Sequence, residues 1–143
     1  MKVLELFSGI GGMHYALKVG GIDAEVLAVE INTIANSVYH HNFPSATLKS
    51  KNILSLSVEE INKFAPEILL MSPPCQPFTR VGLNKDLDDV RTDPLKHILS
   101  LLPELTSLSF ILVENVKGFE VSEARKKLVS CLEKQYQIQE FLL

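Results

Sequence analysis

The sequence predicts an α/β fold in which a mostly parallel sheet carries helices on both faces. Short apolar runs alternate with stretches of helical pattern, and this order is typical of a parallel sheet with right-handed crossovers. The runs are apolar at consecutive positions, which indicates strands that are covered on both sides. A length of 143 residues suits one domain of common size, so we expect a single domain over residues 1–143.

The predicted strands are residues 3–7, 26–30, 46–48, 68–71, 110–113 and 137–143. Five helices are expected between them. The glycine pair 20–21 ends the first helix, Asn32 or Thr33 begins the second, and residues 57–60 match a capping box at the start of the third. Residues 95–105 form the fourth predicted helix, and Ser122 begins the fifth. In the fifth helix Ala124, Leu128 and Leu132 share one face, which we expect to be buried.

Composition limits the setting and the partners. No apolar run approaches the roughly 20 residues that span a bilayer. Two cysteines suggest neither a disulfide framework nor a zinc site, so we expect a reducing compartment, cytoplasmic or nuclear. A net charge of −3 argues mildly against nucleic-acid binding by charge alone. A local patch remains open to Lys49, Lys51, Arg80, Lys85, Arg91 and Lys96.

The first candidate site is the glycine turn 7–12 after the first strand. Its glycines let a backbone approach a ligand and lead into a helix N-terminus. Glu30 ends the second strand 18 residues after Gly12, where a carboxylate typically accepts hydrogen bonds from ribose. The turn is not G-x-G-x-x-G, so an adenosyl ligand suits it better than a dinucleotide. The alternative is a structural turn with a solvated glutamate.

The second candidate is Cys75, which follows the predicted strand 68–71 and the stiff pair Pro73-Pro74. Open α/β sheets carry their chemistry at the carboxyl ends of strands, so Cys75 is a candidate nucleophile. The alternative is a small residue in a turn. Cys131, which lies within a helical pattern, is expected to be inert.

The third candidate is Glu114, directly after the strand 110–113 and 39 residues beyond Cys75. That interval holds one loop, one helix and one strand, the content of a single βαβ crossover. If the two strands are neighbours, the thiol and the carboxylate emerge side by side. The alternative is a charged residue that marks a strand end. The four histidines lack metal-ligand spacing, so no metal site is expected.

Taken together, the glycine turn, Pro74-Cys75-Gln76 and Glu114-Asn115-Val116 resemble motifs of the cytosine-C5 methyltransferases, in that family's order and spacing. The longer runs 71–80 and 114–120 resemble the tRNA aspartate methyltransferase subgroup, which is itself similar to DNA methyltransferases. The resemblance implies a Rossmann-like fold that uses S-adenosyl-L-methionine. It also implies a nucleic-acid substrate, a tRNA anticodon loop first and DNA second.

The resemblance also implies roles for individual residues. Cys75 would attack C6 of cytosine, and Glu114 would protonate or hydrogen-bond N3. The cofactor would be held by residues of four strand ends: Phe7, Gly9, Ile10 and Gly12 in the glycine turn, Glu30 on the ribose, Ile31 on the adenine, Asn52 and Ile53 beside it, and Ser72 under the methionine end. Family members often carry aspartate at the position of Asn52.

The family continues with an arginine-containing motif, a target-recognition domain and a C-terminal element that are absent from this sequence. We therefore expect a truncated chain or half of a split enzyme, in which the strand 110–113 exposes unpaired backbone groups to a complementary chain or a second copy. Three alternatives stay open. The first is an amino-methylating enzyme, whose motif Ser72-Pro73-Pro74 fits, although Cys75 stands where that motif has an aromatic residue. The others are a nicotinamide-dependent enzyme and an incomplete protein that binds cofactor or a partner chain without turnover.

Overall fold

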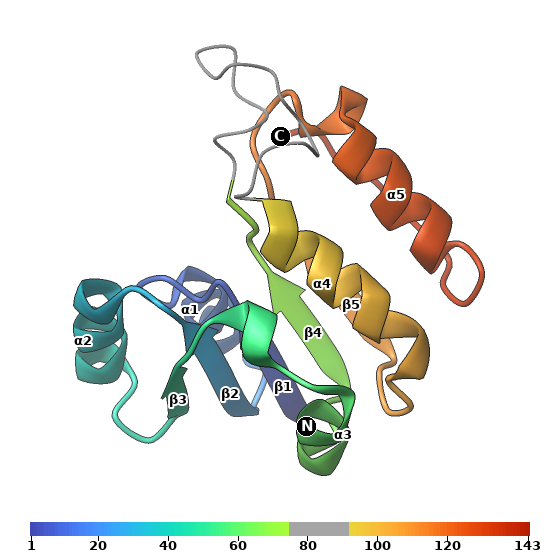
Figure 1. Cartoon of the computed structure of the whole chain (residues 1–143). Coiled ribbons are helices and arrows are strands. Elements are labelled where there is room, and N and C mark those ends of the chain that lie inside the picture. The colour runs from blue at the N-terminus through green and yellow to red at the C-terminus, as the bar shows by residue number, and fades with distance from the viewer. Residues whose placement is uncertain (75–91) are drawn as a thin grey trace. The chain divides into compact units, whose positions relative to one another are not determined.

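The computed structural model describes residues 1–74 and 92–143. The chain forms two compact units (Figure 1). The sheet unit comprises Met1–Ser72 and Glu104–Glu114, and the helical unit comprises Pro73–Pro103 and Asn115–Leu143. Each unit is described by itself below.

Five parallel strands make the sheet, in the order β3-β2-β1-β4-β5 (Figure 1). Their bounds are β1 Lys2–Leu6, β2 Glu25–Glu30, β3 Thr47–Ser50, β4 Ile68–Met71 and β5 Phe110–Val113. The predicted parallel sheet is confirmed, and β4 and β5 have the predicted bounds. β3 begins one residue later than expected and runs to Ser50. Its edge position explains the weak signal, because none of its four residues is fully buried.

Three helices connect the strands of the sheet unit: α1 Gly12–Val19, α2 Thr33–Asn42 and α3 Val58–Phe64, with a short 3₁₀ turn, η1, at Ile53–Ser55. The predicted caps are present. Gly20 ends α1, Asn32 Oδ1 accepts from the first turn of α2, and Ser57 Oγ accepts from Glu60 N–H. The capping box is only half formed, because the Glu60 carboxylate pairs instead with Lys49 and Lys51.

Two further described helices, α4 Asp93–Leu101 and α5 Glu123–Leu132, belong to the helical unit. The 3₁₀ turns η4 Leu102–Glu104 and η5 Phe119–Val121 follow β4 and β5 in the chain. Ser122 caps α5 by accepting from Arg125 N–H. Ala124, Leu128 and Leu132 are buried on one face of α5, as predicted. The predicted helix 95–105 ends earlier, at Leu101, where the 3₁₀ turn replaces it.

The predicted strand at 137–143 is wrong, because these residues form no regular structure. Only the last three of them are consecutively apolar, and all three are exposed. The polar half of the segment is tied down by its side chains instead, since Glu140 pairs with Arg125 of α5. A strand also requires a neighbour for its backbone groups, and a short apolar run does not supply one.

β5 lies at an edge of the described sheet and pairs only with β4. Phe110 and Leu112 point to the same side of the strand, and they are 65% and 57% exposed. This arrangement agrees with the expectation that the strand 110–113 leaves backbone groups unpaired along one side.

A buried carboxylate lies under the glycine turn. Glu5, in the middle of β1, is 1% exposed. One carboxylate oxygen accepts from the Tyr39 hydroxyl at 2.7 Å, and the other accepts from His14 N–H at 3.2 Å. The Tyr39 hydroxyl also meets His14 Nδ1 at 2.7 Å. Because Gly11 provides no side-chain cap for α1, Glu5 takes over that task from within the sheet.

Aromatic rings close this cluster from the α2 side. The His14 ring stacks on Phe43 with centroids 3.9 Å apart. Gly11 has φ +93°, and a Cβ there would lie 2.5 Å from the Phe43 ring. Glycine is therefore required at residue 11 both for its backbone conformation and for the close approach of the ring. The cluster fixes where α1 begins relative to β1.

We predict that Tyr39→Phe destabilises the protein more at neutral pH than at acid pH. Burial raises the pKa of Glu5 above its ordinary value of 4.5, and the Tyr39 hydroxyl counteracts this rise. With a raised folded-state pKa, the free energy of unfolding falls as pH rises from 4.5 through the folded-state value. Removing the hydroxyl raises the folded-state pKa of Glu5 further. The cost of Tyr39→Phe to the free energy of unfolding should therefore reach about 1–3 kcal/mol at neutral pH.

Urea unfolding between pH 4.5 and 8 measures this difference. The matched control is the same substitution in a Glu5→Gln background, where the part of the pH dependence that comes from Glu5 should disappear and only that of His14, the other partner of the hydroxyl, should remain. A cost in the wild-type background that is equal at pH 5 and pH 8 would contradict the prediction.

Candidate functional site

The described residues that sequence analysis assigned to a site all lie at the carboxyl ends of the five parallel strands, within the sheet unit. They are Phe7, Gly9, Ile10 and Gly12 after β1, Glu30 and Ile31 at the end of β2, Asn52 and Ile53 after β3, Ser72 after β4 and Glu114 after β5. The strand order reverses between β1 and β4, and ligands of open α/β sheets bind outside such a point. The glycine turn and Ser72 flank it.

The glycine turn has an unusual backbone. Phe7 has φ +56°, which is rare for a residue with a bulky side chain, and Gly9 and Gly11 also have positive φ. Gly11 N–H donates to the Ser8 carbonyl at 2.9 Å and closes the turn. Strained positions of this kind gather at ligand sites, where the surrounding structure holds them. The sequence showed the glycines, but it gave no sign that Phe7 shares their conformation.

Glu30 joins two loops of the site through its carboxylate. Oε2 accepts from Gly9 N–H at 3.0 Å, and Oε1 accepts from the N–H groups of Ile31 and Asn32 at 2.8 and 2.9 Å. A carboxylate has about four lone-pair sites, so one remains open. A sugar diol that used both oxygens would therefore replace one of these backbone contacts. These three contacts were not predictable from the position of the acid alone.

The glycine turn also fits an adenosyl ligand sterically and chemically. A Cβ at Gly12 would meet no atom within 4 Å, so the backbone is open to a close approach. The buried Ser8 hydroxyl has no hydrogen-bond partner among the described residues. Ile31, which is 62% exposed, and Ile10 offer apolar surface beside these polar groups. A ligand with an aromatic base and a polar sugar would match this pairing of apolar surface and polar groups.

Asn52 and Ile53 differ in what they offer. Asn52 is exposed, and its Oδ1 accepts from Leu54 N–H at 3.0 Å, which caps η1. The Ile53 side chain is 5% exposed and packs in the interior, so only its backbone is open to a ligand. Of the three residues expected beside an adenine, only Ile31 and Asn52 therefore have side chains that are able to contact it.

β4 and β5 deliver the catalytic candidates. Met71 pairs with Val113, and Glu114 N–H donates to the Met71 carbonyl at 3.1 Å, so Ser72 and Glu114 leave neighbouring strands together. The expectation that these strands are neighbours is confirmed. Cys75 lies outside the described residues, and its approach to Glu114 stays a prediction. The Glu114 side chain is exposed and does not pack in the core.

Asn115 is a residue whose position sequence analysis did not anticipate. Its Nδ2 donates to the Pro73 carbonyl at 3.1 Å, and its Oδ1 accepts from Val116 N–H at 2.9 Å. The side chain thereby ties the segment after β5 to the double proline that precedes Cys75. An amide directly after a strand-end acid was the only signal in the sequence.

Neither a metal-binding cluster nor a membrane-spanning helix is present among the described residues. No group of three His, Cys, Asp or Glu side chains in residues 1–74 and 92–143 is placed to hold a metal ion. Among the helices described, none has the length and apolar character needed to cross a membrane.

Comparison with known proteins gives concordant matches. The family model of the C-5 cytosine-specific DNA methylases matches residues 1–138. The mouse protein named tRNA (cytosine(38)-C(5))-methyltransferase is 53% identical over the whole chain, which covers 35% of that protein. A Dictyostelium discoideum protein named DNA (cytosine-5)-methyltransferase is 46% identical, again over the whole chain and 39% of its own length.

A solved structure agrees with the fold. The crystal structure of a Spodoptera frugiperda DNMT2 mutant superposes with a TM-score of 0.80 at 49% identity, over 93% of this chain and 40% of that one. The chain thus spans less than half the length of these relatives, and the α/β methyltransferase fold is common to them. With a family model that matches nearly its whole length, the chain belongs to the C-5 cytosine-specific DNA methylase family.

Proposed function

We propose that this chain carries the cofactor site and the catalytic residues of an S-adenosyl-L-methionine-dependent enzyme that methylates C5 of cytosine in nucleic acid. The observation that carries the proposal is the convergence of the glycine turn, Glu30, Ser72 and Glu114 at the carboxyl ends of adjacent strands. The relatives' names supply the substrate, tRNA for the mouse protein and DNA for the Dictyostelium one. We take tRNA as the first substrate, in the cytoplasm or nucleus.

When bound, S-adenosyl-L-methionine would supply an electrophilic methyl group on its sulfonium. In this proposal Glu30 accepts from the ribose, Ile31 packs on the adenine, and Asn52 and the Ile53 backbone lie beside it. Phe7, Gly9, Ile10 and Gly12 line the turn, and Ser72 lies under the methionine end. The open Cβ position at Gly12 and the unpartnered Ser8 hydroxyl support this placement.

The chain's own residues then activate the target cytosine. The Cys75 thiolate attacks C6, and the new S–C bond converts C5 into an enamine carbon that is nucleophilic enough to be alkylated. Glu114 protonates or hydrogen-bonds N3 and stabilises the charge that develops on the ring. A base removes the C5 proton, and elimination frees Cys75. The target cytosine has to leave its stack to reach the thiol.

A second candidate is a protein that binds cofactor or a partner chain without turnover. The observation in its favour is β5, which has an unpaired outer edge in the described sheet and exposed Phe110 and Leu112 side chains on one of its faces. An edge strand with apolar side chains favours pairing with another chain. In this reading the partner strand completes the sheet, either from a complementary chain or from a second copy.

Covalent trapping tests the first candidate. Because a fluorine at C5 cannot leave as a proton would, tRNA containing 5-fluorocytosine should stall the protein as a Cys75 adduct. Cys75→Ser should give no adduct, and Glu114→Gln should slow its formation by about 10²–10³-fold. Glu25→Gln, at the end of β2 opposite the candidate site, is the control and should trap like the wild type. A wild-type chain that binds cofactor but never traps the tRNA would favour the second candidate.

Glu30→Gln should weaken S-adenosyl-L-methionine binding by about tenfold or more, since an amide offers one acceptor oxygen where three N–H groups and a ribose need two. Isothermal calorimetry measures the change. Glu25→Gln, at the opposite end of β2, is the matched control with the same chemistry and should bind normally. Equal affinities for the two variants would exclude Glu30 from the site.

Self-association through β5 is tested by Phe110→Lys with Leu112→Lys. Charged side chains on an edge strand oppose pairing with another strand. Sedimentation velocity should show a concentration-dependent dimer in the wild type and a monomer in the double variant. Val121→Lys, at another exposed apolar residue, should leave the dimer intact. A wild type that stays monomeric at high concentration would contradict a second copy as the partner.

A further inference from the structure

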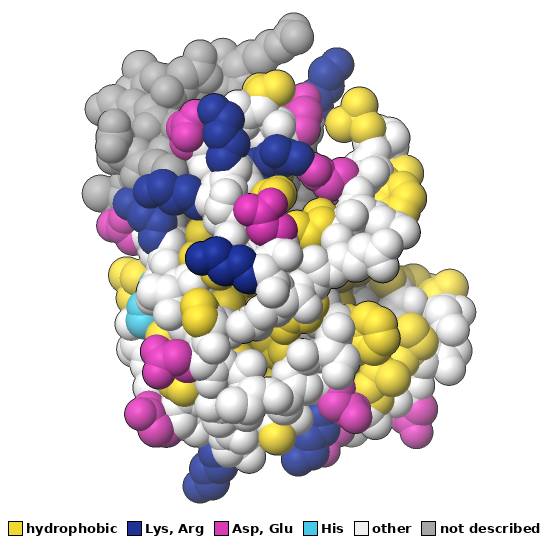
Figure 2. All heavy atoms as spheres, turned by 90° about the vertical axis from the view of Figure 1, so that its right-hand side faces the viewer, with side chains coloured by type: hydrophobic (Ala, Val, Ile, Leu, Met, Phe, Trp, Pro, Cys, Tyr) yellow, Lys and Arg dark blue, Asp and Glu magenta, His cyan; other side chains and the backbone are white. Residues whose placement is uncertain are grey.

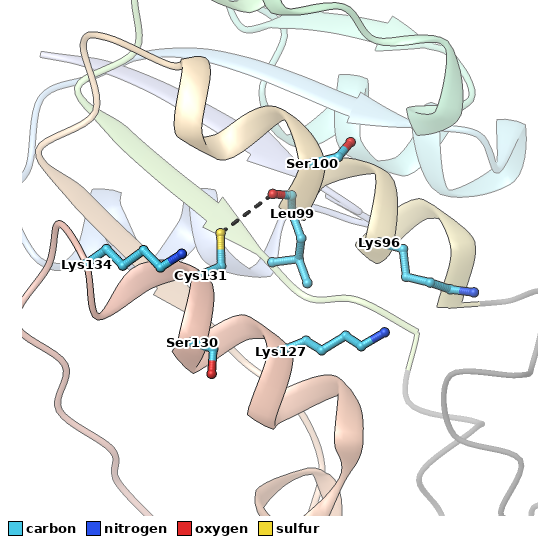
Figure 3. A pocket seen from close by; sticks show the side chains of 7 residues that line it. All are labelled: Lys96, Leu99, Ser100, Lys127, Ser130, Cys131 and Lys134. Atoms are coloured by element: carbon cyan, nitrogen blue, oxygen red, sulfur yellow. Dashed lines mark hydrogen bonds between the residues drawn. The ribbon is translucent and has the colours of Figure 1, made fainter.

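A groove runs between α4 and α5 within the helical unit (Figure 3). Its lining consists of three lysines, two serines and two apolar residues: Lys96, Lys127, Lys134, Ser100, Ser130, Leu99 and Cys131. We call this the lysine groove. None of these lining residues belongs to the candidate site, and none of them is a carboxylate.

The spacing along the helices produces this lining. Lys127, Ser130, Cys131 and Lys134 follow one another at intervals of three, one and three residues, so they share one face of α5 and the turn after it. The buried residues Ala124, Leu128 and Leu132 lie on the neighbouring face of α5. The Cys131 thiol donates to the Leu99 carbonyl at 3.6 Å, which joins α5 to α4 (Figure 3).

Two lysines of the groove carry charge that no ion pair among the described residues neutralises. On the face of the molecule that carries α5, basic and acidic side chains are interspersed (Figure 2). Arg125 and Lys126 of α5 pair with Glu140 and Glu123. Lys127 and Lys134, by contrast, have no ion pair with any residue that the structure describes.

Lys96 faces the same groove from α4. It pairs with Asp93 at 2.6 Å, in a contact between side chains that are both more than one-third exposed. An exposed pair of this kind contributes little energy, and Lys96 adds positive charge to the groove while it stays paired. The ammonium groups that a bound anion would engage first are therefore those of Lys127 and Lys134.

The arrangement suits a chain of phosphates better than a single one. Seven residues separate Lys127 from Lys134, which corresponds to about 10 Å along a helix axis. Two lysines that far apart contact different phosphates of one strand. The serine hydroxyls between them add donors of the type that commonly bind phosphate and sugar oxygens.

We propose that the lysine groove binds the sugar-phosphate backbone of the tRNA substrate, outside the site that receives the cytosine. The proposal rests on the proposed function for the identity of the nucleic acid. Its contacts fix the position of the strand and carry no sequence information. Free phosphate or a mononucleotide would bind weakly, because each engages one lysine at a time.

The test is the affinity of the full chain for tRNA as a function of salt. Lys127→Gln with Lys134→Gln should weaken binding at least tenfold and should lower the slope of log K against log salt by about 1.5, the value for two lost phosphate contacts. The matched control is Lys18→Gln with Lys63→Gln, two exposed lysines of the sheet unit, which removes the same net charge. Circular dichroism checks that both double variants are folded.

A loss confined to the groove variant supports the proposal. Equal losses in the two double variants, no loss in either, or a wild type that does not bind tRNA overturns it. Inorganic phosphate that competes with tRNA at sub-millimolar concentration also overturns it in favour of a small-anion site. The proposed function fails separately: it is contradicted by absent covalent trapping and absent cofactor binding, neither of which depends on Lys127 or Lys134.

Discussion

The parallel pairing of β1 with β4 is the constraint on which the candidate site depends. It reverses the strand order in the middle of the sheet, so the connections on its two sides diverge and leave the strand ends open at that point. The glycine turn leaves β1 there, Ser72 leaves β4, and Glu114 follows on the next strand. Without that pairing the candidate cofactor residues and the candidate acid Glu114 would belong to separate surfaces.

The buried Glu5 connects this constraint to the core. A carboxylate inside a sheet is costly unless its oxygens are hydrogen-bonded, and here it has Tyr39 from α2 and His14 N–H from α1 as partners. The same contacts hold the start of α1 under the glycine turn. Glu30 completes the connection from the other side by accepting from Gly9 N–H. Two carboxylates, one buried and one at the rim, thus fix the turn between β1 and α1.

Local chemistry made most of the fold predictable, and long-range contacts account for what was missed. Continuous apolar runs such as 68–71 and caps such as Asn32 and Ser122 are decided by neighbours in sequence, and the structure has them as expected. The segment 137–143 failed because a strand needs a partner that its own residues do not reveal. Likewise Glu30 was recognisable as an acid at a strand end, whereas its three backbone donors, the left-handed Phe7 and the Asn115 contact with Pro73 depend on residues brought together by folding.

Net charge was the least informative property of the sequence, and the structure explains why. A total of −3 counts every ionised group equally, but an ion-paired lysine contributes little field beyond its partner, while an unpaired one attracts an anion directly. Lys49 and Lys51, which composition placed in a possible basic patch, share Glu60 and are locally compensated. Lys127 and Lys134 attracted no attention in the sequence, yet they face a groove whose described lining holds no carboxylate. The position of a charge relative to its neighbours, rather than the overall balance, therefore decides where a polyanion is able to bind.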